Sequence, residues 1–184
     1  PGTSLIQESA FQVVSIATTT GFLTANYSNW PLFVPILLLL TAFIGACAGS
    51  TGGGIKVVRT LVLAKQSAGE ITKLIHPNAV ISIKLGKKAV SPRVAESVWG
   101  FFSIYVIVFI ILFLFLLAQG NDFITSFSAV GATLNNLGPG LGEVSNNYQS
   151  LSDYSKLGLC MAMLLGRLEI FTLLVLFTPA FWRK

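Results

Sequence analysis

An uncharged apolar run between Ser97 and Asn121 constrains the fold more than any other feature of this chain. The run is longer than the roughly 20 residues that a helix needs to cross the hydrocarbon core of a bilayer. Over the whole chain, 53% of the residues are hydrophobic and 10% are charged, against roughly 25% charged in an ordinary soluble domain. Such a chain cannot cover its surface with polar groups, so a soluble globule is excluded.

Two further apolar stretches are predicted to span the membrane. Residues 31–66 form the first, which a glycine-rich segment at residues 48–54 interrupts. Residues 157–182 form the second, which holds Arg167 near its middle. Together with an outer span over residues 97–118, these stretches predict an all-α polytopic membrane protein.

The basic residues set the orientation of these spans. Eight of the 12 lysine and arginine residues lie between Lys56 and Arg93, where Glu70 is the one acidic residue. The positive-inside rule therefore places the connector over residues 67–96 in the cytoplasm. We expect no nucleic-acid partner, because no aromatic residue is interleaved with these lysines.

The chain offers few groups for metal or redox chemistry. It has one histidine, His76, and two cysteines, Cys47 and Cys160, which lie in apolar runs without a CxxC spacing. We therefore expect the cysteines to be small buried hydrophobic residues, and we expect no cofactor.

Two short amphipathic segments, each too short to cross the membrane, indicate a repeated unit. Residues 5–17 precede a polar string at residues 18–22, and residues 122–132 precede a second string at residues 133–138. About 10 helical residues rise about 15 Å, half of a hydrocarbon core. Each segment is therefore predicted to be a re-entrant half-helix; a short core helix is the alternative.

The first string carries groups that suit a weakly held cation. Unsatisfied backbone in hydrocarbon costs several kcal/mol per peptide group, so a string at membrane depth must face protein or a water-filled path. Thr18, Thr19 and Thr20 supply uncharged hydroxyl and carbonyl oxygens, which favour a monovalent ion. Gly21 can adopt a positive φ, and the half-helix directs its negative C-terminal end at the same place. An ordinary turn is the alternative.

Three segments carry a family resemblance: FQVVSIATTTGF at residues 11–22, GACAGSTGGGIKVVR at 45–59 and SAVGATLNNLGPG at 128–140. They resemble the Trk/Ktr/HKT potassium transporters, and are most similar to the bacterial TrkH-type subunits of that family. The resemblance implies four span–pore-helix–span (pore-loop) repeats around one ion path. This chain is then expected to supply the third repeat without its outer span (1–66) and the fourth repeat (97–184).

The resemblance also implies partners. The first is the remaining half of the same subunit, with the first two repeats, and we expect Pro1 to be a break rather than a natural N-terminus. Further implied partners are a second copy in a homodimer, a cytosolic nucleotide-binding regulatory subunit and the lipid bilayer. The implied location is the bacterial inner membrane.

The resemblance assigns the two strings to a selectivity filter of backbone carbonyls. Its expected residues are Thr18, Thr19, Thr20 and Gly21 in the first string and Thr133, Leu134, Asn135, Asn136 and Gly138 in the second. The expected K+ ligands are Thr18, Thr19, Leu134 and Asn135. In the second string, the equivalent of the filter glycine is expected at Asn135 or Asn136, with Gly138 falling later.

A glycine-rich loop is the first gate candidate, formed by Gly49, Ser50, Thr51, Gly52, Gly53 and Gly54. Three consecutive glycines disfavour a helix by about 1 kcal/mol each, so the inner span is predicted to break here. Phosphate binding is excluded, because Ile55 stands where a P-loop has lysine. Helix contact through the Gly45-x-x-x-Gly49 and Gly49-x-x-x-Gly53 spacings is the alternative. The resemblance implies that the loop obstructs the ion path when closed.

Arg167 is the second gate candidate. An arginine at the centre of a span costs about 2.5–3.5 kcal/mol on insertion scales, so it normally faces a bundle interior or water. An ion pair is the alternative, but Glu169 is two residues away and lies on a different helix face. A positive charge beside a cation path opposes conduction, and the resemblance implies an arginine below the filter.

We therefore predict inward movement of K+ without covalent chemistry. The alternative is a secondary transporter whose discontinuous helices bind a small solute or Na+ at the midplane. An intramembrane enzyme is disfavoured, because Arg167 and Glu169 are the ionisable residues at membrane depth and neither forms a plausible nucleophile–base pair with Ser50 or Thr51.

Overall fold

The computed structural model describes residues 2–31, 33–45, 47, 49–50, 52–79, 81–86, 88–168, 175 and 182. Most of these residues are helical, so the predicted helical class is confirmed. In chain order the helices are α1 (Gly2–Ala17), η1 (Tyr27–Asn29), α2 (Phe33–Ile44), α3 (Val57–Ile75), α4 (Pro92–Ala118), α5 (Phe123–Leu134), η2 (Gly142–Val144) and α6 (Asp153–Arg167).

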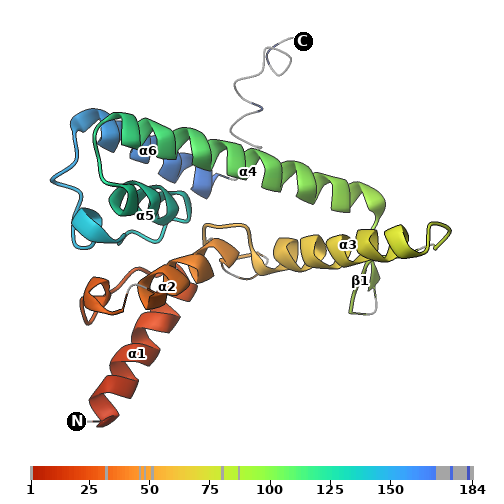
Figure 1. The fold of residues 1–184 in the computed structure, drawn as a ribbon, viewed down its shortest axis with the longest axis horizontal. Helices are drawn as coiled ribbons and strands as arrows, with labels where there is room; N and C mark the ends of the chain where they lie inside the picture. The colour runs from red at the N-terminus through yellow and green to blue at the C-terminus, as the bar shows by residue number, and fades with distance from the viewer. Residues whose placement is uncertain are drawn as a thin grey trace.

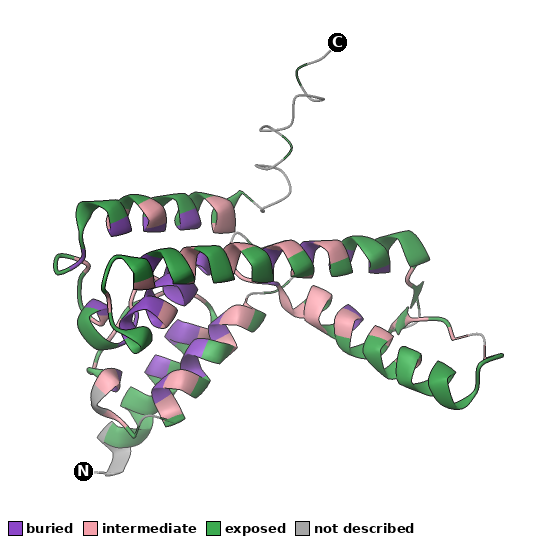
Figure 2. Cartoon of the chain, turned by 45° about the horizontal axis from the view of Figure 1, so that its top comes forward, coloured by how far each residue is buried: buried purple, intermediate pink, exposed green. Residues whose placement is uncertain are grey.

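Helix α5 is the centre of the fold. It packs against α2 on one side and against α4 and α6 on the other (Figure 1). Nine of its 12 residues are buried, and buried residues gather where these helices meet (Figure 2). Small residues permit the close approach, since a Cβ at Gly131 would lie 3.1 Å from the Phe43 ring. The rings of Phe109 and Phe127 pack edge-on beside it, with centroids 5.3 Å apart.

Helix α4 is long and apolar enough to cross a membrane, with 27 residues and a mean hydropathy of 3.1 in its most apolar window. Only 17% of that window is buried within the chain, so most of its apolar surface needs lipid or another part of a protein to cover it. The outer span predicted over residues 97–118 lies inside this helix. The helix begins earlier, with Pro92 in its first turn, where proline costs no hydrogen bond.

The stretch predicted as an inner span over residues 31–66 contains two helices that meet at an angle (Figure 1). Helix α2 ends at Ile44, and α3 begins at Val57 and continues into the connector as far as Ile75. Most of α3 is exposed (Figure 2), apart from Val62. Val62 packs against Ala95 and Val98 of α4, which fixes the near end of the connector.

The connector also holds the one departure from an all-helical fold among the described residues. Strand β1 (Lys84–Leu85) pairs antiparallel with β2 (Lys88–Ala89). The turn between them includes Gly86 with a φ of +60°, a backbone angle that glycine adopts without strain. This two-residue pairing leaves the predicted helical class unchanged.

Helix α6 occupies the first part of the stretch predicted as the inner span over residues 157–182. It begins at Asp153 and ends at Arg167, where Leu168 is the C-cap. Glu169 and most of the later residues lie outside the described residues. Cys47 and Cys160 are both exposed, so the expectation that they are buried is wrong.

Candidate functional site

The two polar strings leave their half-helices with the same backbone path. Thr19 follows α1 and Asn136 follows α5, and both have a φ of +54°. Each string then turns back to its helix through two matching hydrogen bonds. In the first string these are Thr19 N to Ile16 O (3.0 Å) and Thr20 N to Ser15 O (2.8 Å); in the second they are Asn136 N to Thr133 O (3.0 Å) and Leu137 N to Ala132 O (2.8 Å).

This match identifies Gly138 as the equivalent of Gly21. Both glycines stand two residues beyond the +54° residue, and their φ angles are +100° and +82°. The expectation that the equivalent is Asn135 or Asn136 is therefore wrong. The reason lies in the helix end, because α5 continues to Leu134 instead of ending at residue 132.

The register of the second string follows from that longer helix. Thr133 and Leu134 form the last residues of α5, and the Thr133 hydroxyl donates to the Ala129 carbonyl 2.7 Å away. Asn135 is the C-cap, so it corresponds to Thr18, and Asn136 corresponds to Thr19. Thr18 and Thr19 are therefore the counterparts of Asn135 and Asn136.

The two strings touch each other at Gly21. A Cβ built there would lie 2.0 Å from the carbonyl oxygen of Leu137 and 3.3 Å from Pro139 Cδ. Real side chains do not approach that closely, so the contact requires glycine. Thr18 and Thr20 are exposed, and their hydroxyl oxygens lie 2.8 Å apart. The structure thus brings the first string directly against the second.

A buried tyrosine, Tyr27, and a half-buried one, Tyr148, hold the outer part of the second string. Tyr27, in η1, donates to the Gly140 carbonyl at 2.9 Å, and Tyr148 donates to the Gly138 carbonyl at 2.5 Å. Burial raises the pKa of Tyr27 to about 12 and raises the pKa of Tyr148 well above its usual range. Both phenols are therefore protonated donors at neutral pH.

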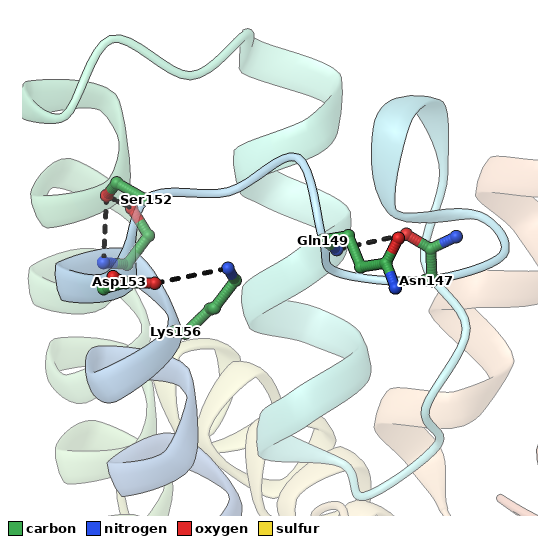
Figure 3. A network of polar contacts seen from close by, with 6 residues as sticks. Asn147, Gln149, Ser152, Asp153 and Lys156 are labelled. Carbon is green, nitrogen blue, oxygen red and sulfur yellow. Dashed lines mark hydrogen bonds and ion pairs between the residues drawn. The ribbon is translucent and has the colours of Figure 1, made fainter.

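A set of local polar contacts shapes the return from the second string to α6 (Figure 3). The Asn147 side-chain oxygen accepts from the backbone N–H of Gln149 at 3.1 Å, forming a turn. Ser152 caps α6, with its hydroxyl accepting from Ser155 N at 3.2 Å. Lys156 and Asp153 pair at 3.4 Å on the exposed first turn, where an ion pair adds little stability.

Asn135 is fully buried at the end of α5 and links three elements. Its side-chain amide donates to the Gly131 carbonyl at 2.8 Å, and its side-chain oxygen accepts from the Tyr105 hydroxyl of α4 at 2.7 Å. Its backbone carbonyl faces the glycine-rich loop, because a Cβ at Gly53 would lie 2.1 Å from that oxygen. Tyr105 was not among the site residues predicted from the sequence, where its one signal is a hydroxyl within a largely apolar span.

The glycine-rich segment between α2 and α3 is a loop closed at its neck. The backbone N–H of Ile55 donates to the Phe43 carbonyl at 3.0 Å. Gly45 and Gly54 both have positive φ, and a Cβ at Gly45 would lie 2.7 Å from Gly53 O. Because the described part of this segment is not helical, the helix-contact alternative is wrong. Thr51 lies outside the described residues.

Arg167 lies beside this loop at the C-terminal end of α6. The two share a small cavity of about 50 Å³ lined by Ser50, Gly52, Gly54, Lys56, Arg59, Phe101, Tyr105, Leu165, Gly166 and Arg167. The preceding residue, Gly166, touches the second half-helix, since a Cβ there would lie 1.9 Å from Leu134 O. The structure therefore brings both gate candidates together directly beside the end of α5.

Among the described residues, no group of three or more His, Cys, Asp or Glu side chains is placed to hold a metal ion. The oxygens at the junction are backbone carbonyls, hydroxyls and the Asn135 amide. A long apolar helix, short apolar helices and polar strings that meet between them are features typical of helical membrane proteins.

Comparison with known proteins gives the family. Residues 2–184 match the TrkH family profile, described as a cation transport protein, and the chain belongs to this family. It is 58% identical over 179 residues to the Trk system potassium uptake protein TrkH of Escherichia coli K12, covering 97% of this chain and 37% of that relative. It is 45% identical to the potassium uptake protein TrkG of the same organism over 176 residues, covering 96% of the chain and 36% of the relative.

The fold also matches a solved structure. The crystal structure of the potassium transporter TrkH from Vibrio parahaemolyticus superposes with a TM-score of 0.88 at 56% sequence identity. The match covers 96% of this chain and 38% of that one. The chain thus spans less than two-fifths of the length of the relatives that it matches, and it has the helical fold of a membrane transporter.

Proposed function

We propose that this chain forms part of a potassium uptake subunit and supplies two of the strings that line its ion path. The observation that carries the proposal is the pair of strings with one backbone path, which touch at Gly21 and Leu137. Two equivalent turns of uncharged oxygens around one axis suit a dehydrated monovalent cation. The names of the relatives, which are Trk system potassium uptake proteins, support K+ as that cation.

The ion ligands are proposed to be backbone carbonyls at Thr18 and Thr19 and at Asn135 and Asn136, because the equivalence of the strings pairs these positions. Leu134 corresponds to Ala17 of α1, and its carbonyl faces Gly166. The Asn135 carbonyl likewise faces a glycine, Gly53 of the loop. Leu134 is the ligand expected from the sequence that this equivalence supports least, because its counterpart Ala17 lies in a helix and is not an expected ligand.

The gate is proposed to consist of the glycine-rich loop and Arg167. The cavity that they share lies beside the end of α5, where a loop residue approaches the Asn135 carbonyl. A loop in that place blocks an axial path, and a nearby positive charge repels a cation. Opening then requires the loop to leave the cavity.

The finer assignments of the assembly are also proposals. We infer that the remaining half of the subunit completes the path, that two subunits form a homodimer in the bacterial inner membrane, and that a cytosolic nucleotide-binding subunit regulates it. The rival is a secondary transporter that binds an organic solute or Na+ at broken helices. Saturable uptake of an organic substrate without Rb+ flux favours the rival.

The test is the location of a bound ion in a full-length subunit containing this chain. Crystals grown with Rb+ in place of K+ are expected to show an anomalous peak between the carbonyls of Thr18 and Thr19 and those of Asn135 and Asn136. A peak elsewhere in the protein, with none between the two strings, would refute the filter assignment.

A further inference from the structure

Asn135 stands where the second string, the glycine-rich loop and the outer span meet. It is a polar side chain with no exposed surface, and both ends of its amide are bonded. The nitrogen donates to Gly131 O within its own helix (2.8 Å). The oxygen accepts from Tyr105 (2.7 Å), a residue 30 positions earlier in the chain. The side chain therefore has one orientation that satisfies both groups.

The loop is in contact with both the backbone and the side chain of Asn135. A Cβ at Gly53 would lie 2.1 Å from the Asn135 carbonyl oxygen, and a Cβ at Gly54 would lie 3.2 Å from its side-chain oxygen. No side chain separates the loop from the string at this point. A displacement of one backbone must therefore be accommodated by the other.

The neighbourhood of this contact is otherwise well anchored. Ile55 N bonds to Phe43 O at the neck of the loop, and the Phe43 ring packs edge-on against the Tyr105 ring with centroids 6.3 Å apart. Tyr105 is itself buried. The ring is held by packing, so its hydroxyl reaches Asn135 without the entropy cost of ordering a mobile side chain.

We propose that Tyr105 is a positioning residue that couples the glycine-rich loop to the second string through Asn135. Its hydroxyl holds the Asn135 oxygen in place, and the Asn135 carbonyl in turn supports Gly53 in the closed loop. Loop release then loosens the second string, so opening and ion discrimination change together. The role of this coupling in ion transport rests on the proposed function, whereas the coupling itself does not.

The test uses Tyr105→Phe, which removes the hydroxyl and keeps the ring. It is made in the full-length subunit with Ser50→Cys as a reporter and the other cysteines replaced, including Cys47 and Cys160. The rate at which a small thiol reagent labels position 50 reports the position of the loop. We expect Tyr105→Phe to raise this rate about fivefold, the factor that one hydrogen bond of average net strength supplies. We also expect Na+ to compete more strongly with Rb+ uptake.

The control is Tyr154→Phe, which removes an exposed hydroxyl near the start of α6 and is expected to change neither readout. A second variant, Gly53→Ala, pushes the loop away from Asn135 O directly and should raise labelling even if Tyr105→Phe does not fold. Its matched control is Gly69→Ala, where a Cβ meets its nearest neighbour at 3.4 Å.

The outcomes separate the two proposals. If Tyr105→Phe or Gly53→Ala speeds labelling but the full-length subunit takes up no Rb+, the coupling is supported and the transport assignment is rejected. Rb+ uptake with labelling and Na+ competition unchanged in both variants overturns the coupling and leaves the transport assignment intact.

Discussion

The contact between the two strings predicts that Gly21 and Gly138 respond differently to the same substitution. Both glycines have left-handed backbone, with φ angles of +82° and +100°, so alanine is strained by about 1–2 kcal/mol at either position. They differ in their surroundings. A Cβ at Gly21 would lie 2.0 Å from Leu137 O, whereas a Cβ at Gly138 has nothing within 4 Å.

The steric difference sets the size of the effect. Since Cβ atoms are essentially never found within 3.0 Å of another heavy atom, Gly21→Ala must separate the strings by about 1 Å. A displacement of that size at carbonyl ligands is expected to reduce Rb+ uptake by about 100-fold, as 1 Å misplacements do at other preorganised sites. Gly138→Ala carries only the backbone strain and should retain most of the uptake.

The assay is initial Rb+ uptake by cells that lack other potassium uptake and express each full-length variant at equal level. Thermal unfolding in detergent accompanies it, to separate a local change in the path from a general loss of folding. If Gly21→Ala and Gly138→Ala prove equal in uptake and in stability, the strings do not touch as described.

Two further predictions concern Arg167 and the outer tyrosines. Arg167→Ala is expected to raise basal Rb+ uptake several-fold, because it removes a positive charge beside the proposed path. Arg167→Lys keeps the charge and should stay near the parent. If uptake by Arg167→Ala equals that of the parent at equal expression, the barrier role is wrong. Because the pKa of Tyr27 is raised to about 12 from about 10 in the unfolded chain, the stability that its neutral form supplies is complete below pH 10 and is lost as the pH rises through 12. Tyrosinate absorbance should therefore show, as a difference between the parent and Tyr27→Phe, one phenol titrating near pH 12; titration of that phenol near pH 10 contradicts the burial.

The features that the sequence could predict depend on local chemistry. Uncharged length predicted α4, and consecutive glycines predicted that no helix continues through residues 52–54. The polar string after α1 was visible because three threonines and a glycine follow an amphipathic segment directly. Each of these inferences needs only neighbouring residues, so no knowledge of the packing was required.

The features that the sequence could not predict depend on contacts between distant residues. Helix α5 extends through Thr133 and Leu134, and the polar residues beyond it gave no sign of where the helix ends. That two-residue difference shifted the expected filter glycine to Asn135 or Asn136. The bond between Tyr105 and Asn135 joins positions 30 residues apart, and nothing in an apolar span marks one hydroxyl as its donor.

The short β1–β2 hairpin has a consequence for how the chain can be divided. Contacts that unite its two units, such as Tyr27 with Gly140 and Val62 with Ala95, lie outside the hairpin turn, and a Cβ at Gly86 in that turn would have nothing within 4 Å. A polypeptide cut at that turn keeps every interaction between the strings. Two separately translated fragments therefore have the surfaces to reassemble, and gene fission at this place is compatible with the fold.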